Sequence, residues 1–125
     1  MTDLILPWAK PPLTGNRTRG NPHARANEVK QALTEARATI ADAQLLPVQC
    51  AYITLHLQLA TRHRRDADGM FPTLKVVQDA LVLEGVLPDD SWVHVPRAAC
   101  EIHPPAGGQD SLMWVAIDAP VSVPA

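Results

Sequence analysis

The densest group of charged residues lies near the middle of the chain, in the stretch Arg62-His63-Arg64-Arg65-Asp66-Ala67-Asp68. Asp66 and Asp68 follow a strand-like segment, and in an extended backbone residues two apart point to the same face, about 7 Å from each other. Two like charges at this distance repel, and a shared divalent cation relieves the repulsion. Carboxylate oxygens suit Mg²⁺, which also binds phosphate groups. The stretch therefore indicates either a magnesium site or a polar loop whose charges pair in solvent.

Further charged residues follow this pair along the chain. Lys75 lies one or two turns into the next predicted helix, on the side that can return toward the two aspartates. The start of that helix adds free N–H groups and the positive end of a helix dipole, both of which favour anions. Asp89 and Asp90 come after the helix, where a third metal-binding carboxylate could lie. The simpler interpretation of these two is an acidic turn.

Charge is divided unevenly along the chain. Residues 1–65 hold nine of the eleven Lys and Arg against four acids, and residues 66–125 hold two basic residues against nine acids. The formal net charge of −2 counts against a nucleic-acid-binding domain of the usual strongly basic kind. The basic first half still leaves room for a local anion-binding face, because local charge sets the field there.

The first half of the chain predicts a strand, a loop and a helix. A short apolar strand at Leu4–Leu6 precedes a loop over residues 10–21 that is rich in Pro, Gly and polar residues. Asn21-Pro22 is a typical helix start, and the helix is expected to run to about Ala43. The expected buried face, spaced near 3.6 residues, consists of Val29, Leu33, Ala36 and Ile40.

The second half begins with strict alternation over residues 51–59, which predicts a half-buried strand. A second helix enters near Pro72 and stops at Gly85, with Leu74, Val77, Ala80 and Leu81 as its buried face. Residues 92–95 and 98–102 read as strand, and the intervening Pro96 indicates a sheet edge or a bulge. Residues 112–117 form the last predicted strand, joined to the preceding one as a hairpin.

This order of elements predicts the α+β class, with two α-helices packed on a small mixed β-sheet. A chain of 125 residues is expected to form one domain over residues 1–125, with residues 119–125 as a flexible tail. Its apolar runs are too short for a membrane span, and its first residues lack a signal peptide. Two cysteines make no disulfide framework, so a cytoplasmic protein is expected.

Taken together, these residues resemble the RusA family of phage- and prophage-encoded Holliday junction resolvases, or crossover junction endodeoxyribonucleases. The segments that carry the resemblance are Arg64–Asp68, Leu74-Lys75, Asp79–Leu81, Gly85–Leu87 and Asp89-Asp90. Near the start of the chain, Leu6–Trp8, Pro11-Pro12 and Asn16-Arg17 resemble the opening segment of the same family. The resemblance covers most of the chain and is strongest over residues 62–91.

The resemblance implies a RusA-like fold and a homodimer that acts in the cytoplasm of a bacterial host. Its activity would be Mg²⁺-dependent resolution of four-way DNA junctions, by paired symmetric phosphodiester hydrolysis in DNA recombination and repair. Asp66, Asp68 and Asp90 match metal-binding catalytic carboxylates for one or two Mg²⁺ ions, with Mn²⁺ as a substitute, and Lys75 matches a catalytic lysine. The residues expected to contact DNA are Asn16, Arg17, Arg19, Arg62, Arg64 and Arg65. Asp79 and Asp89 are expected to have secondary roles.

Two alternatives to this nuclease remain open at the level of the sequence. Many family members carry an asparagine after the second aspartate, where this chain has Gly69. A non-catalytic DNA-binding phage protein that keeps the fold is therefore the first alternative, and an α+β interaction module is the second. A zinc site is not expected, because Cys100-x-x-His103 lacks a second ligand pair and alternation turns Cys100 away from His103. His56, on the polar face of its strand, is expected to be a surface or interface residue.

Overall fold

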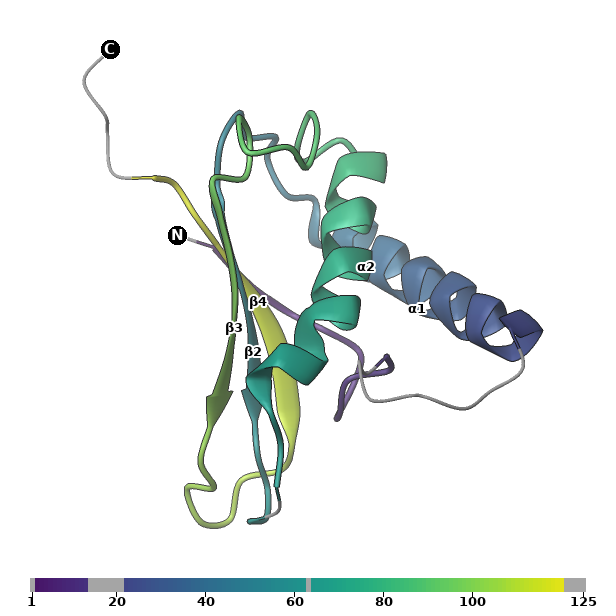
Figure 1. The fold of residues 1–125 in the computed structure, drawn as a ribbon. Coiled ribbons are helices and arrows are strands. Elements are labelled where there is room, and N and C mark those ends of the chain that lie inside the picture. Colours follow the sequence, from purple (N-terminus) through teal and green to yellow (C-terminus); the bar gives the residue numbers. More distant parts are fainter. Residues whose placement is uncertain (1, 14–21, 63, 121–125) are drawn as a thin grey trace.

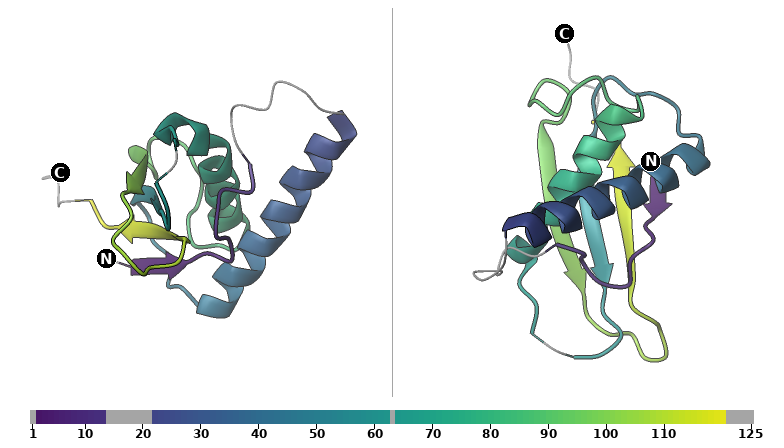
Figure 2. Two further views of the ribbon diagram at one scale, coloured as in Figure 1. Left: turned by 90° about the horizontal axis from the view of Figure 1, so that it is seen from below. Right: turned by 90° about the vertical axis from the view of Figure 1, so that its right-hand side faces the viewer.

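The protein, described here from a computed structural model, forms a sheet with helices on one side. The structure describes residues 2–13, 22–62 and 64–120. The elements are β1 (Thr2–Ile5), α1 (Pro22–Ala43), β2 (Tyr52–Gln58), the 3₁₀ helix η1 (Ala67–Met70), α2 (Phe71–Leu83), β3 (Arg97–His103) and β4 (Leu112–Asp118). Figure 1 shows α1 and α2 on the same side of the sheet, and Figure 2 shows α1 crossing α2. The expected α+β class, two helices on a small mixed sheet, is confirmed.

The sheet has four strands in the order β1-β4-β2-β3. β2 is parallel to β3 and antiparallel to β4, and β1 is antiparallel to β4. The alternation expected over residues 51–59 is confirmed, since Ile53, Leu55 and Leu57 are fully buried beneath the helices. The apolar cross-strand pairs of the core are Ile53↔Ile117, Leu55↔Val115 and Leu57↔Met113. The intervening residues of β2 point to the other face, which the helices leave uncovered.

The first helix has the bounds that the sequence predicts, and it buries Ala36 and Ile40 as expected. Ala32 is buried as well, and Leu33 is partly buried against the core. Val29 was expected in the core but is exposed. Figure 1 gives the reason, because the N-terminal end of α1 points away from the sheet and from α2. The buried residues of α1 all lie further along the helix, at Ala32, Ala36 and Ile40.

The second helix begins at Phe71, with Pro72 in its first turn, and buries Leu74, Val77, Ala80 and Leu81 as predicted. Gly85 adopts a left-handed backbone with φ of 78°. The N–H groups of Gly85 and Val86 bond to the carbonyls of Val82 and Leu81, at 3.0 and 2.9 Å, so the last carbonyls of the helix are satisfied. The predicted helix stop is therefore confirmed.

Two predictions about the last strands are wrong. Residues 92–95 form a turn rather than a strand, with the N–H groups of His94 and Val95 bonded to the carbonyl of Ser91. The last two strands do not form a hairpin, because β4 pairs with β1 and β2 while β3 pairs in parallel with β2. β4 instead takes an inner position between β1 and β2, where its apolar residues Met113, Val115 and Ile117 are buried. The edge position of β3, directly after Pro96, is as expected.

Within the described residues, neither helix has the combination of length and apolar character that crossing a membrane requires. The buried apolar side chains of the two helices belong to one core cluster with those of the sheet.

Candidate functional site

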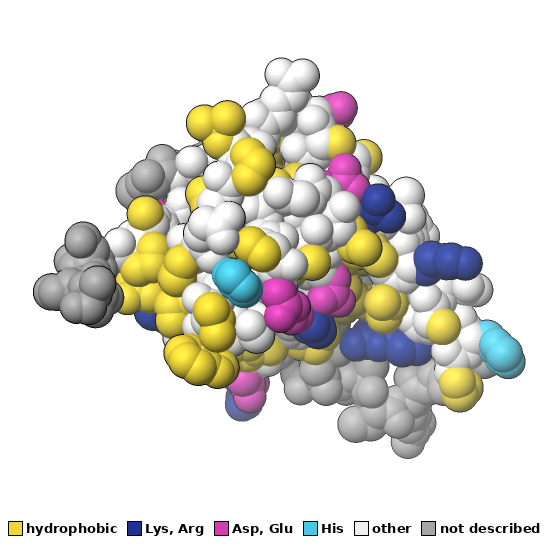
Figure 3. All heavy atoms as spheres, turned by 90° about the horizontal axis from the view of Figure 1, so that it is seen from above, with side chains coloured by type: hydrophobic (Ala, Val, Ile, Leu, Met, Phe, Trp, Pro, Cys, Tyr) yellow, Lys and Arg dark blue, Asp and Glu magenta, His cyan; other side chains and the backbone are white. Residues whose placement is uncertain are grey.

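Lys75 is the centre of a charged cluster at the exposed side of α2. Its Nζ lies 2.6 Å from Oδ2 of Asp90 and 2.9 Å from Oδ1 of Asp79. Asp79 is one helical turn further along α2, and Asp90 belongs to the turn that follows the helix. Figure 3 looks onto the end of the molecule where α2 terminates and shows acidic and basic side chains next to one another. Three residues singled out in the sequence are therefore in contact.

The segment after α2 is what brings Asp90 back to Lys75. The left-handed Gly85 reverses the chain, and the following Val86 and Leu87 are buried in the core. The N–H of Leu87 also bonds to the carbonyl of Leu81 at 3.3 Å, so the returning segment is held against the last turn of the helix. The apolar Gly85–Leu87 segment thus positions a carboxylate rather than serving only as a helix stop.

The contact between Lys75 and Asp90 shifts the pKa values of both residues. The hydrogen bond to Asp90, followed by that to Asp79, raises the pKa of Lys75. The hydrogen bond from Lys75 in turn lowers the pKa of the Asp90 carboxyl. The Lys75 side chain is 60% exposed and that of Asp90 33%, so solvent screens the pair and its contribution to stability is small. The result is a lysine cation whose charge is shared between two carboxylates.

The two aspartates of the Asp66-Ala67-Asp68 stretch do not share an extended backbone, so the prediction that they point to one face of a strand is wrong. Asp66 is extended, with φ of −106° and ψ of 133°, but Asp68 lies in the 3₁₀ helix η1. The Asp66 carbonyl accepts a hydrogen bond from the N–H of Gly69 at 3.1 Å, which starts this helical turn. The chain turns here because η1 leads directly into α2. Both side chains are exposed.

The remaining predicted residues are less tightly positioned. Arg64 Nε lies 3.9 Å from Oδ1 of Asp66, and the arginine side chain is almost fully exposed. Arg62 and Asp89 are exposed, whereas Arg65 is partly buried. Three predicted DNA contacts lie outside the described residues, namely Asn16, Arg17 and Arg19. His63 lies outside them as well.

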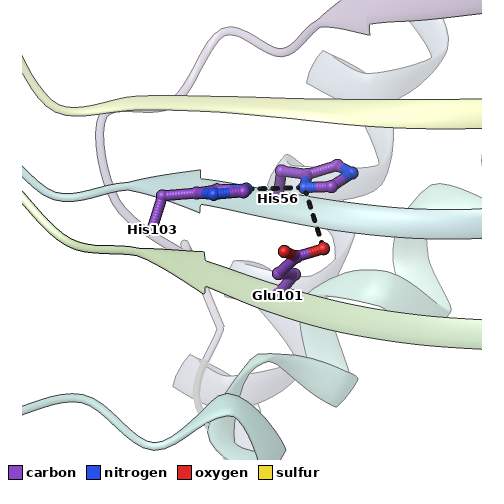
Figure 4. A group of neighbouring side chains, drawn as sticks. All are labelled: His56, Glu101 and His103. Carbon is purple, nitrogen blue, oxygen red and sulfur yellow. Dashed lines mark hydrogen bonds and ion pairs between the residues drawn. The ribbon is translucent and has the colours of Figure 1, made fainter.

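A second cluster lies on the sheet face that the helices leave uncovered. Nδ1 of His56 on β2 is 2.8 Å from Nε2 of His103 and 3.7 Å from Oε2 of Glu101, both on β3 (Figure 4). Trp114 of β4 stacks on both imidazoles, with ring centroids 4.8 Å from His56 and 5.3 Å from His103. Burial, followed by the charge of His103, lowers the pKa of His56.

This second cluster is made of residue types that commonly bind metal ions. Among the described residues, it is the one set of three or more His, Cys, Asp and Glu side chains placed to hold a metal ion. The predicted ligands Asp66, Asp68 and Asp90 do not form such a set here. Their donor type suits Mg²⁺, but their side chains would have to move together to share an ion.

Sequence reasoning missed the His56–Glu101–His103 cluster although part of its signal is visible. Glu101 and His103 are two residues apart on a strand, and His56 stands on the polar face of another. What the sequence does not give is the parallel register, which pairs His56 with Glu101. Cys100 is partly buried and packs against the core. This agrees with the expectation that it points away from His103.

The chain matches no model of a known protein family, and no curated protein is significantly similar to it. The resemblance of residues 62–91 to the RusA family therefore stays a hypothesis, as do the activity and metal that it implies. The geometry that bears on the hypothesis is the contact between Lys75 and Asp90.

Proposed function

We propose that this protein is a Mg²⁺-dependent, structure-selective endodeoxyribonuclease of the RusA type, which resolves four-way DNA junctions by paired symmetric cuts. The observation that carries the proposal is the hydrogen bond of 2.6 Å between Lys75 and Asp90, which are 15 residues apart in the sequence. The family resemblance assigns both residues to one active site. Their contact supports that assignment, because the segment after α2 turns back along the helix and brings Asp90 next to Lys75.

The charge balance around Lys75 explains why such a site would need a cation. Asp79 and Asp90 already share the one lysine, and Asp66 and Asp68 precede the same helix. A phosphate approaching Lys75 would meet the two carboxylates that already pair with it. A divalent cation removes that repulsion, which makes metal dependence the expected behaviour of the site.

In the proposed mechanism, Asp66, Asp68 and Asp90 would hold one or two Mg²⁺ ions. Bound Mg²⁺ supplies polarisation of the scissile phosphate and a water of lowered pKa. If Asp90 held the ion with the other two carboxylates, its contact with Lys75 would weaken, and the Lys75 ammonium would be available to the substrate. Lys75 then stabilises negative charge that develops on the phosphate or the leaving oxygen.

DNA positioning falls to the basic residues that precede α2 and to the segment near the start of the chain. Exposed Arg62 and Arg64, with Arg65, contact backbone phosphates, which orients DNA without reading its sequence. Paired cuts in two strands of one junction require two active sites, so the active species is a twofold homodimer. We propose that the protein is encoded by a phage or prophage and acts in the cytoplasm of the bacterial host.

The test is cleavage of a labelled synthetic four-way junction, with and without Mg²⁺ and with Mn²⁺ in its place, beside a linear duplex of the same sequence. Symmetric nicks in the junction alone, dependent on metal, are expected. Asp68→Asn should abolish cleavage and leave junction binding intact or tighter. Asp42→Asn, an exposed carboxylate near the end of α1, is the matched control and should cleave as the wild type does.

Two results would overturn the proposal. Cleavage that survives Asp68→Asn would remove the carboxylates from the mechanism. Junction binding without cleavage in either metal would favour the non-catalytic DNA-binding protein instead.

A further inference from the structure

The sheet face opposite the helices carries three potential metal ligands from two neighbouring strands. Glu101 and His103 are two residues apart on β3, so both side chains point to the same face. In the parallel register of β2 and β3, His56 stands directly beside Glu101. Figure 4 shows the two imidazoles directed at each other and the Glu101 carboxylate reaching toward His56. No backbone movement is needed to bring these groups together.

The distances fit a single small ion. The three ligand atoms all lie within 4.8 Å of one another, and two of the separations are 2.8 and 3.7 Å. At a tetrahedral Zn²⁺ with bonds of about 2.0–2.1 Å, ligand atoms are about 3.3 Å apart. Small rotations of the side chains therefore convert the present arrangement into a coordination sphere. The hydrogen bond between the imidazoles is lost in the process, and the metal bonds replace it.

The ligand types select the ion. Imidazole nitrogen suits Zn²⁺, Cu²⁺ and Ni²⁺, whereas Mg²⁺ takes oxygen ligands almost exclusively. Two histidines and one glutamate are a known ligand set for zinc, in which the fourth position takes water or an exogenous ligand. The Glu101 side chain is 58% exposed and that of His56 15%, so the ion would reach the partly buried histidine from the glutamate side.

Trp114 holds the two histidine side chains in place in the absence of metal. Its ring is nearly parallel to that of His56, with an interplanar angle of 6°, and it also stacks on His103 at 15°. Side chains fixed in this way lose little conformational entropy when they bind an ion. Every residue of β2, the strand that carries His56, pairs with both β3 and β4, so this strand is held on both sides.

We propose that His56, Glu101 and His103 form a transition-metal site for Zn²⁺ on the uncovered face of the sheet. The site is independent of the nuclease proposal, because its ligands come from β2 and β3 whereas Lys75, Asp79 and Asp90 belong to α2 and the turn after it. Its three protein ligands leave one position for water.

Calorimetric titration of the full chain with Zn²⁺, in a buffer that does not bind metal, tests the proposal. One ion per chain is expected, with no competition from millimolar Mg²⁺. His56→Gln and His103→Gln should each weaken binding at least about tenfold. Glu101→Gln, at an exposed position, should weaken it with the least risk to folding. His23→Gln, an exposed histidine in the first turn of α1, is the control and should bind as the wild type does.

Quenching by Cu²⁺ locates the site independently. Cu²⁺ bound between the histidines would lie against Trp114 and quench its fluorescence, so Trp114→Phe should remove most of the quenching. Trp92→Phe, which changes an exposed tryptophan outside the sheet, should leave the quenching in place. The proposal fails if the wild type does not bind Zn²⁺ at micromolar free metal. It also fails if the folded His56→Gln, Glu101→Gln and His103→Gln variants all bind Zn²⁺ with wild-type affinity.

Discussion

Thr73 and Leu13 exchange two hydrogen bonds, although 60 residues separate them in the sequence. The Thr73 hydroxyl donates to the Leu13 carbonyl at 2.6 Å, and its oxygen accepts from the Leu13 N–H at 3.3 Å. Both residues are buried. One side chain in the first turn of α2 thus satisfies both backbone groups of a residue near the start of the chain, and it fixes that segment beside the helix that carries Lys75.

Replacement of this threonine should be costly. Thr73→Val keeps the shape but leaves the buried N–H and carbonyl of Leu13 without partners, which costs about 1–3 kcal/mol. Urea unfolding should show this loss in the free energy of unfolding, with little change in slope. Thr73→Ser keeps the hydroxyl and should retain most of the stability, and equal losses in both variants would contradict the role of the hydrogen bonds.

Gly85 should tolerate alanine poorly for a purely backbone reason. A Cβ at this position meets no atom within 4 Å, but φ of 78° lies in the left-handed region. Gly85→Ala should therefore lower the free energy of unfolding by about 1–2 kcal/mol. Gly69→Ala is the matched control, because that position is equally open and has no positive φ. If both variants are equally stable, the positive φ of Gly85 does not disfavour alanine, and the prediction is wrong.

The pair Lys75–Asp90 should be visible in the titration of Asp90. Because Lys75 lowers the pKa of this carboxyl, its stabilising contribution is present above the unfolded pKa of an aspartate and is lost as the pH falls through the lower folded value. In Lys75→Met, NMR should show the Asp90 pKa shifted upward. The stability difference near pH 7 should stay below about 1 kcal/mol, since the pair is exposed. An unchanged Asp90 pKa would mean that the ion pair does not form in solution.

Cys100 should be a slow nucleophile in the folded protein. Burial raises its pKa to about 11. At pH 8 such a thiol is about 0.1% thiolate, against roughly a quarter for a free cysteine with a pKa near 8.5. In Cys50→Ser, alkylation of Cys100 by iodoacetamide should be at least about tenfold slower in the native than in the urea-unfolded chain, and it should accelerate steeply up to pH 10. Equal native and unfolded rates would show that the thiol is accessible.

Local patterns in the sequence predicted the elements well because each pattern has a local physical cause. The bounds of α1, the alternation of β2 and the stop at Gly85 all follow from side-chain periodicity or backbone preference. Val29 shows the limit of such patterns, because helical spacing states which residues share a face and not where the neighbouring elements end. The class of the fold follows from the order of its helices and strands, but the pairing of strands within the sheet does not.

The candidate sites depend on those neighbours. The contact between Lys75 and Asp90 follows from a reversal at a glycine, so the sequence could anticipate it. The divergence of Asp66 and Asp68 comes from a 3₁₀ turn that no periodicity marks. The His56–Glu101 pair requires knowing that β3 joins β2 in parallel, and the expected hairpin of the last two strands would have placed β3 differently.

The pairing of β1 with β4 also constrains how the protein is made. Thr2 lies opposite Ile117, so one of the earliest residues of the chain pairs with one of the last of the sheet. A ribosome extends the chain at about 5–20 residues per second, so β1 emerges several seconds before its partner exists. The helix pair α1–α2 precedes β4 along the chain and can form before β4 has been made. Closure of the sheet by β1 must wait until translation has passed residue 118.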